Sequence, residues 1–296
     1  LEFRRVLFRS YKRGNWSALV KQAHNHTVSE FTDDKLHTLY TRAINTRLLG
    51  CDALHYLQFL QELAAGHFSP PSEQDERMAL MCHYDFWQQS GPKAGFATLA
   101  QSLKRLEHPE LRAELSDLLP LLINRVQHEQ LAMPHLPDNP LRLHARYARE
   151  QVLVGFGATN FEQQPSAREG VFVIAEQNIE LLFVTLNKTE KHFSPTTRYH
   201  DYAISESLFH WQSQNSARPD RGKGLSYIEQ KEKGKRLFLF VREQNSDEFG
   251  RTLGFVNFGE VEYVSHSGSQ PMNIKWRLMT PMPPFMWKEV AKLAVG

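Results

Sequence analysis

The sequence predicts an α+β protein, with a helical N-terminal half followed by a β-rich C-terminal half. Up to about residue 157, apolar residues recur at helical spacing between helix-start and helix-stop signals. Beyond that point, short β-branched or aromatic runs follow one another, each bounded by Gly, Asn, Ser or Pro. We therefore predict a mostly antiparallel sheet or small barrel in the second half, closed by a C-terminal helix.

The first half contains several helical segments. In "DALHYLQFLQELAAG", Asp52 is the expected cap and Gly66 the expected stop. "SEQDERMALMCHYDFWQQSG" begins with acidic residues and is expected to end at Gly91. "PELRAELSDLLPLLINRVQH" is expected to kink at Pro120. "PLRLHARYAREQVLVGFG" is predicted to be the last helix of this half.

The second half contains the strand-like runs. We predict strands in "VFVIAE", "ELLFVTL", "RLFLFVRE", "GFVNFGEVEYVS" and "NIKWRL". The last two are expected to flank a turn at Ser267 to Gln270, and "PPFMWKEVAKLAVG" to form a short helix.

The chain is predicted to have three parts: residues 1–10, 11–157 and 158–296. The opening "LEFRRVLFRS" is not a signal peptide, because Arg4, Arg5 and Arg9 interrupt its apolar run. It resembles the translation of a common sequencing adapter, so we expect these ten residues to be a scar. Residues 11–157 are then a helical region and 158–296 a β-rich C-terminal domain.

Composition narrows the class of protein. Hydrophobic residues make up 41% and charged residues 23%, which is typical of a globular protein, and the net charge of +2 neither favours nor excludes a polyanionic partner. Cys51 and Cys82 cannot form a disulfide framework, and no CxxC zinc motif occurs. No run approaches the ~18 apolar residues of a membrane span. We expect a cytoplasmic protein.

The known catalytic motifs are absent from the sequence. It contains no GxxxxGK[ST], HExxH, GxSxG or GxGxxG, so we predict no catalytic residue and no cofactor in this chain. The histidines of the second half also match no metal-site spacing, and no metal is predicted: His192, His200, His210 and His266.

A basic stretch with interleaved aromatic residues runs from residue 187 to 242. It contains eleven Lys and Arg residues and six Asp and Glu residues. Cations neutralise phosphates and aromatic faces accept stacked bases, so this stretch favours nucleic-acid binding. A solvated surface over core aromatics is the alternative. The expected phosphate contacts are Arg198, Arg218, Arg221, Lys223 and Arg242.

The segment "FHWQSQN" gives a more detailed prediction. As a strand, it places Phe209 and Trp211 on one face and His210, Gln212 and Gln214 on the other. The second set is expected to read base edges or the backbone. Trp211 is a candidate stacking ring, and the alternative is a polar edge strand bonded to neighbouring loops.

The segment "FSPTTRYHDY" is predicted to be a loop. Arg198 would contact phosphate there and Tyr199 would stack on a base, or Arg198 would pair with Asp201 as a structural ion pair.

A minor alternative is a cryptic nuclease. "EQK" at residues 229–231 resembles the E-x-K end of a restriction-type nuclease site. Such a site needs clustered carboxylates and a Lys around one metal ion. The candidates are Glu176, Glu180, Glu229 and Lys231.

The runs from "PLRLHARYAREQVLVGFG" through "FHWQSQN", together with "LFLFVREQNSDEFGRTLGFVNFGEVEYVSHSGSQPMNIKWRLMTPMP", resemble the C-terminal region of bacterial DEAD/DEAH-box superfamily II helicases. These proteins often carry an N-terminal HKD (phospholipase D-like) nuclease. The resemblance covers about residues 140–292.

The resemblance implies a protein that loads on DNA and translocates with ATP and Mg²⁺. The motor motifs and the HKD nuclease are absent from this chain. It therefore implies an accessory module whose partners are DNA and the upstream helicase core. A protein-interaction or autoinhibitory module that packs on that core is the alternative.

Overall fold

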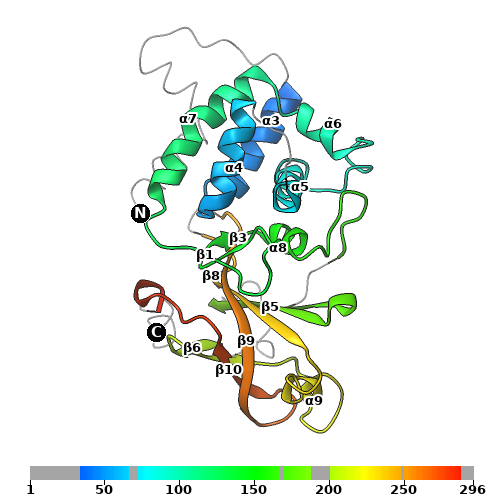
Figure 1. Ribbon diagram of the computed structural model, residues 1–296, viewed down its shortest axis with the longest axis vertical. Coiled ribbons are helices and arrows are strands. Elements are labelled where there is room, and N and C mark those ends of the chain that lie inside the picture. The colour runs from blue at the N-terminus through cyan, green and yellow to red at the C-terminus, as the bar shows by residue number, and fades with distance from the viewer. Residues whose placement is uncertain (1–33, 67–71, 167–169, 188–200, 248–249, 288–296) are drawn as a thin grey trace. The chain divides into compact units, whose positions relative to one another are not determined.

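The computed structural model describes residues 34–66, 72–166, 170–187, 201–247 and 250–287 (Figure 1). The chain divides into two compact units, Leu1–Ser166 and Ala167–Gly296. The predicted scar, residues 1–10, lies outside the described residues. The first unit is helical and the second is built on a mixed, mostly antiparallel sheet, so the predicted α+β class is confirmed.

Helices make up most of the described first unit. They are α3 (Asp34–Ala43), the π-helical turn η1 (Ile44–Leu48), α4 (Leu54–Ala65), α5 (Glu73–Trp87), α6 (Leu99–Lys104), α7 (Pro109–Arg125) and α8 (Arg149–Gly155). Three short strands stand among them: β1 (Leu131–Ala132), β2 (Arg142–Leu143) and β3 (Arg146–Tyr147). α4 packs against α7, and α5 packs against α8.

The helix ends follow the sequence signals in part. Gly66 ends α4 with a φ of 86°, as predicted. Asp52 does not cap α4: the Leu54 N–H donates instead to Gln130 Oε1 (2.9 Å). α5 ends before the predicted Gly91, because Gln88 takes the left-handed conformation.

α7 continues through Pro120 to Arg125. One further expectation about the helices was wrong. The segment "PLRLHARY" forms β2 and β3 rather than a helix, and the Arg142 N–H donates to Tyr147 Oη (2.9 Å).

The second unit contains the strands β4 (Val171–Ile174), β5 (Ile179–Asn187), β6 (Tyr202–Ser205), β7 (Leu208–Gln212), β8 (Arg236–Gln244), β9 (Phe255–Ser267) and β10 (Asn273–Leu278). It also contains the 3-10 turn η2 (Ala175–Gln177), the helix α9 (Gly222–Ile228) and a helical turn at 284–287. All five predicted strands and the turn between β9 and β10 are present.

The strands of this unit follow the order β4-β5-β8-β9-β10-β7-β6. Only β5 and β8 pair in parallel among these neighbours. The order runs from β4 at one edge to β6 at the other, so the sheet is open. Every second residue of a strand lies on the same face. On β5 and β8 both faces are buried and apolar, and Phe183 and Phe240 stack at 5.5 Å on the face opposite the core.

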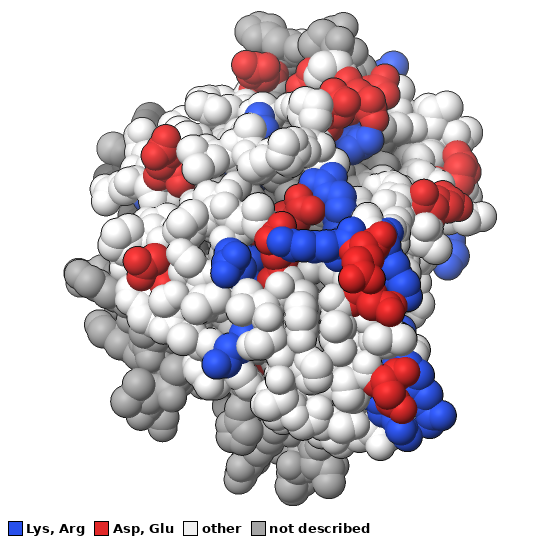
Figure 2. Space-filling model, turned by 60° about the horizontal axis from the view of Figure 1, so that its bottom comes forward, with Lys and Arg blue, Asp and Glu red and all other residues white. Residues whose placement is uncertain are grey.

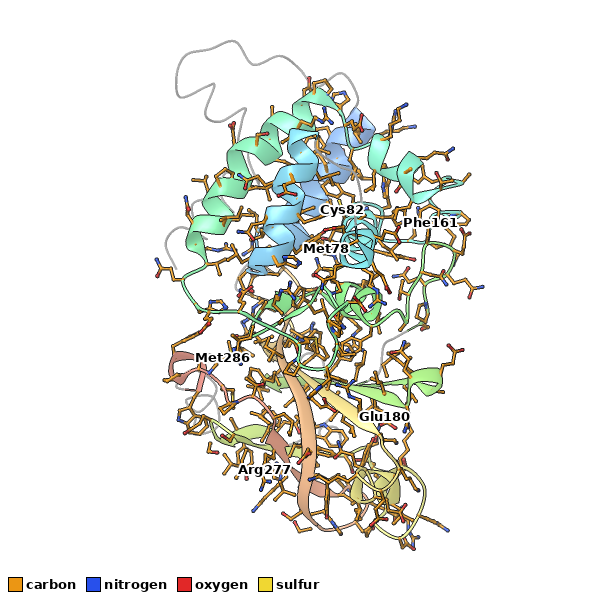
Figure 3. The ribbon with its side chains drawn as sticks, in the orientation of Figure 1. Met78, Cys82, Phe161, Glu180, Arg277 and Met286 are labelled. Atoms are coloured by element: carbon orange, nitrogen blue, oxygen red, sulfur yellow. The ribbon has the colours of Figure 1, made fainter. Side chains whose placement is uncertain are left out.

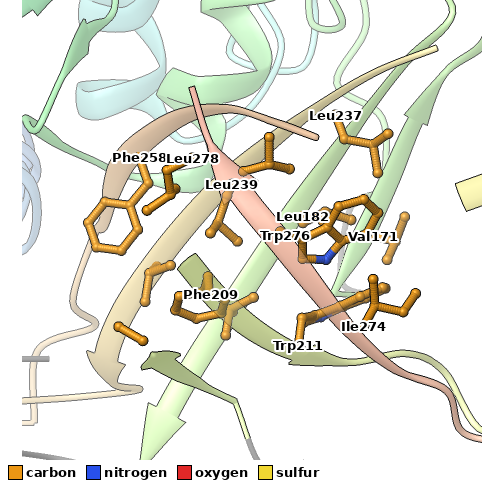
Figure 4. Close-up of a cluster of buried hydrophobic side chains, with 14 of the residues drawn as sticks. Val171, Leu182, Phe209, Trp211, Leu237, Leu239, Phe258, Ile274, Trp276 and Leu278 are labelled. Carbon is orange, nitrogen blue, oxygen red and sulfur yellow. The ribbon is translucent and has the colours of Figure 1, made fainter. Parts of the chain in front are cut away.

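The core of the second unit is a cluster of buried apolar side chains on one face of the sheet (Figure 4). Alternate apolar residues of neighbouring strands converge there, among them Leu182, Phe209, Leu239 and Trp276. α9 contributes Tyr227, whose ring meets that of Trp276 edge-on at 5.9 Å. This packing decides which side chains remain on the opposite face.

Candidate nucleic-acid interface

The strand β10 has one core face and one exposed face. Ile274 and Trp276 are fully buried. Asn273, Lys275 and Arg277 therefore lie on the opposite side, where both cations are exposed. Arg277 on β10 is labelled in Figure 3.

The sheet register brings polar residues of β7 and β6 onto this same side. His210 stands opposite Lys275, and Gln212 stands opposite Asn273. Tyr202 of β6 stands opposite His210 in turn. Directly opposite residues share a face of a sheet. We call the resulting set the outer face: Tyr202, His210, Gln212, Asn273, Lys275 and Arg277.

An aromatic pair forms one side of the outer face. The rings of Tyr202 and His210 stack with their centroids 4.6 Å apart and their planes at 15°. His210 is 9% exposed, whereas Tyr202 is 37% exposed. The Tyr202 ring therefore covers the imidazole and offers a flat apolar surface of its own.

Two cations form the other side. Lys275 and Arg277 make no ion pair with any residue that the structure describes. The acidic residue nearest in register is Glu262, opposite Arg277 on β9, and its carboxylate binds Lys231 at 2.8 Å. Positive charge that is not neutralised within the protein is available to an anionic ligand.

An amide pair lies at one end of the outer face. Gln212 Nε2 donates to Asn273 Oδ1 (3.2 Å), and the Gln212 main-chain N–H donates to Asp201 Oδ1 (2.9 Å). Gln212 Oε1 accepts no hydrogen bond from a described residue. Such amides can bind the donor and acceptor groups of base edges.

The structure confirms part of the predicted facing of "FHWQSQN". His210 and Gln212 share the outer face, and Phe209 and Trp211 share the core face. Because β7 ends at Gln212, Gln214 is not part of this face.

The stacking role predicted for Trp211 was wrong. Its side chain is 5% exposed, and its ring packs against Tyr227 (5.5 Å) and Trp276 (6.1 Å). A base cannot stack on a ring that is enclosed on the core face. The exposed ring on this part of the sheet is instead that of Tyr202, on the neighbouring edge strand β6.

Of the predicted basic stretch, five of the eight described Lys and Arg residues are neutralised by ion pairs within the protein. These ion pairs are Arg218 with Asp220, Lys231 with Glu262, Lys233 with Glu229, Lys235 with Glu180 and Arg236 with Glu260. Figure 2 likewise shows basic and acidic side chains mixed on the surface in view. The stretch is therefore not a continuous positive patch over the residues that the structure describes.

The guanidinium group of Arg242 is engaged within the second unit. It donates from Nε to Thr185 Oγ1 (2.9 Å), from Nη1 to the Leu253 carbonyl (3.2 Å) and from Nη2 to Asn245 Oδ1 (2.6 Å). It also lies over the Phe255 ring at 4.4 Å. These contacts occupy the guanidinium group of Arg242 and give it a structural role, so it is not part of the outer face.

Arg221 and Lys223 remain exposed at the start of α9, without an ion pair to a described residue. Arg198 and Tyr199 lie outside the described residues, as do His192 and His200.

A second group of polar side chains lies in the interior of this unit. Lys235 Nζ donates to Glu180 Oε1 (2.7 Å) and to Ser226 Oγ (2.8 Å). Burial raises the pKa of Tyr227 well above its usual value, and the nearby Glu180 carboxylate adds to this rise. Tyr227 lies within interaction range of the Glu180 and Gln214 side chains, whereas the buried Trp276 Nε1 has no hydrogen-bond partner in the described part of the chain.

The nuclease candidates do not come together. Glu180 binds Lys235, Glu229 binds Lys233 and Lys231 binds Glu262, while Glu176 lies exposed on η2. Across the described residues, no group of three or more His, Cys, Asp or Glu side chains is placed to hold a metal ion. His266 Nδ1 instead meets Tyr263 Oη at 2.6 Å.

The fold and the outer face define an α+β protein whose C-terminal mixed sheet exposes a polar, partly cationic surface. The model of the family described as "Domain of unknown function (DUF3427)" matches residues 141–290, and the chain belongs to this family. No curated protein matches the sequence. No helix within the described ranges is long and apolar enough to cross a membrane.

Proposed function

We propose that this chain is a nucleic-acid-binding accessory module that acts with an ATP-dependent DNA helicase core in the cytoplasm. The resemblance of about residues 140–292 to the C-terminal region of superfamily II helicases supports the helicase context. In this proposal, ATP and Mg²⁺ are used by the upstream core. The present chain holds the DNA and contributes no catalytic group.

The outer face is the observation that carries the proposal. Lys275 and Arg277 are exposed cations without an ionic partner among the described residues, and they lie beside an exposed aromatic ring and an amide pair. Cations hold phosphates, amides bind base edges and aromatic rings accept bases. One face of one sheet supplies all three kinds of contact.

The test is fluorescence anisotropy of the full chain with labelled single-stranded and duplex DNA. We expect binding at low salt and about a tenfold loss in a Lys275→Ala/Arg277→Ala double variant, because two exposed ionic contacts contribute up to about 1 kcal/mol each. Lys93→Ala/Lys104→Ala removes the same charge from exposed positions of the first unit and should bind normally. Absence of binding to both DNAs at ~50 mM salt would refute the proposal.

The protein-interaction alternative predicts a continuous exposed apolar patch. The large exposed hydrophobic residues of the second unit include Val173 on β4, Ile204 on β6 and Val264 on β9. Val173 and Ile204 belong to the two edge strands of the sheet. A few exposed residues of this kind are normal on protein surfaces and do not by themselves indicate a protein interface.

A further inference from the structure

We infer that the outer face is a platform for single-stranded nucleic acid, on which an unpaired base stacks on Tyr202. The inference rests on the proposed function and names the form of nucleic acid that the outer face binds. Its evidence is the position of the Tyr202 ring relative to Lys275 and Arg277.

The three strands place these groups in a fixed pattern. Tyr202, His210 and Lys275 form one row across β6, β7 and β10. Neighbouring strands lie about 4.8 Å apart, so the main chain at Tyr202 lies about 10 Å to the side of that at Lys275. Arg277 is two residues further along β10, about 7 Å from Lys275. A backbone that follows β10 would therefore extend its bases across β7 towards β6.

The stacked histidine holds the tyrosine ring in place. The rings of Tyr202 and His210 stack with their planes within 15° of each other, so the imidazole covers one face of the tyrosine ring. The Tyr202 side chain is nevertheless exposed. A ring that is already oriented loses little conformational freedom when a base stacks on it. The main chain of Gln212, bonded to Asp201 just before β6, further fixes this edge of the sheet.

The exposed ring favours a single strand over a duplex. In a duplex, the faces of the bases are stacked on one another and only their edges reach the grooves. A flat aromatic surface can accept a base only when that base is unstacked, as in single-stranded nucleic acid. The cations alone would serve either form, so Tyr202 is the residue that discriminates between them.

The experiment compares three labelled probes with the full chain. They are a single strand of about 12 nucleotides, within the ~4–16-nucleotide range of sheet-based binding sites, its blunt duplex, and a single strand with abasic sites in the centre. The variants are Tyr202→Ala and Tyr202→Phe, with Lys93→Ala/Lys104→Ala as the control. Thermal unfolding shows whether each variant retains the fold.

We expect the single strand to bind more tightly than the duplex. Tyr202→Ala should lose about 5- to 150-fold in affinity for the single strand, the range for one stacked base, and Tyr202→Phe should retain it. Abasic sites should weaken binding to the original chain but have little further effect on Tyr202→Ala. Lys275→Ala/Arg277→Ala should weaken binding of all three probes.

Two results overturn the inference in different ways. If duplex binds as tightly as single strand and Tyr202→Ala binds both normally, the stacking platform is wrong while the nucleic-acid module stands. If neither form binds, the proposed function itself fails, and the inference fails with it.

Discussion

At the scale of single residues, Asp85 is a buried carboxyl group that connects three helices of the first unit. Its Oδ2 accepts hydrogen bonds from Tyr56 Oη on α4 (2.7 Å) and from Gln151 Nε2 on α8 (2.9 Å). Burial raises its pKa to about 6, against the opposing effects of Tyr56, of the positive charge of Arg47 and of Gln151. Asp85 therefore changes charge in a pH range where exposed carboxyl groups are already ionised.

This raised pKa predicts a specific pH dependence. The folded state binds the proton of Asp85 more tightly than the unfolded state, so its contribution to the free energy of unfolding is full below about pH 4. That contribution falls as the pH rises through about 6, by about 3 kcal/mol in total. Urea unfolding of the full chain at several pH values, followed by far-ultraviolet circular dichroism, measures it.

Asp85→Asn should remove this part of the pH dependence, because asparagine does not titrate. Glu107→Gln, at an exposed position of the same unit, is the matched control and should leave the dependence unchanged. An Asp85→Asn variant whose stability still falls by the same amount between pH 4 and 7 would contradict this role of the carboxyl group.

The facing of single residues could be predicted where it depends on strand alternation alone. The period of two in "FHWQSQN" was sufficient to separate His210 and Gln212 from Phe209 and Trp211. Alternation does not say which ring is exposed. Trp211 is buried because α9 brings Tyr227 against it, and Tyr202 is exposed because its strand is at the edge of the sheet. Both facts depend on contacts distant in sequence.

At the scale of elements, the side chain of Gln230 makes the main-chain hydrogen bonds to β9 that a neighbouring strand would otherwise make. The pairing of β8 with β9 stops at Val261. Beyond that point, Gln230 Nε2 donates to the Val261 carbonyl (2.7 Å) and Gln230 Oε1 accepts from the Tyr263 N–H (2.8 Å). The side chain is buried, so it satisfies two main-chain groups that water does not reach.

Replacing Gln230 with leucine should therefore destabilise the second unit strongly. Two buried main-chain groups would lose their partners, at about 1–3 kcal/mol each, so we expect a loss of about 2–6 kcal/mol in the free energy of unfolding. Tryptophan fluorescence during urea unfolding measures this loss, because three of the chain's five tryptophans belong to this unit: Trp211, Trp276 and Trp287. Gln244→Leu, a half-buried position on β8, is the control, and it should change stability by less than about 1 kcal/mol. An equal effect of the two substitutions would show that the amide contacts of Gln230 are not responsible.

The strands were more predictable than the charges that join them. Each apolar run after residue 170 forms a strand because its β-branched and aromatic residues fit a half-buried sheet. The basic stretch seemed unpaired in the sequence because several of its partners are distant. Lys235 binds Glu180 on β5, and Arg236 binds Glu260 on β9 through two hydrogen bonds (2.9 and 2.7 Å).

At the scale of the whole molecule, the charge balance determines how salt should affect binding. The chain has a net charge of only +2, and most described cations of the basic stretch are held by carboxylates. The described cations left for phosphates on the outer face are Lys275 and Arg277, whereas Arg221 and Lys223 lie at the start of α9, which packs on the core face of the sheet. We therefore expect nucleic-acid affinity to depend only modestly on salt.

The size of this dependence follows from counterion release. For a single strand, the slope of log affinity against log salt is about −0.7 per phosphate neutralised, so the two contacts of Lys275 and Arg277 give about −1.4. Anisotropy titrations of the full chain over a salt series measure the slope. Lys275→Ala/Arg277→Ala should reduce its magnitude by about 1.4, whereas Tyr202→Ala should lower affinity at every salt concentration without changing the slope. An unchanged slope in the double variant would place the phosphate contacts elsewhere, while a changed slope in Tyr202→Ala would mean that this ring positions the cations rather than a base.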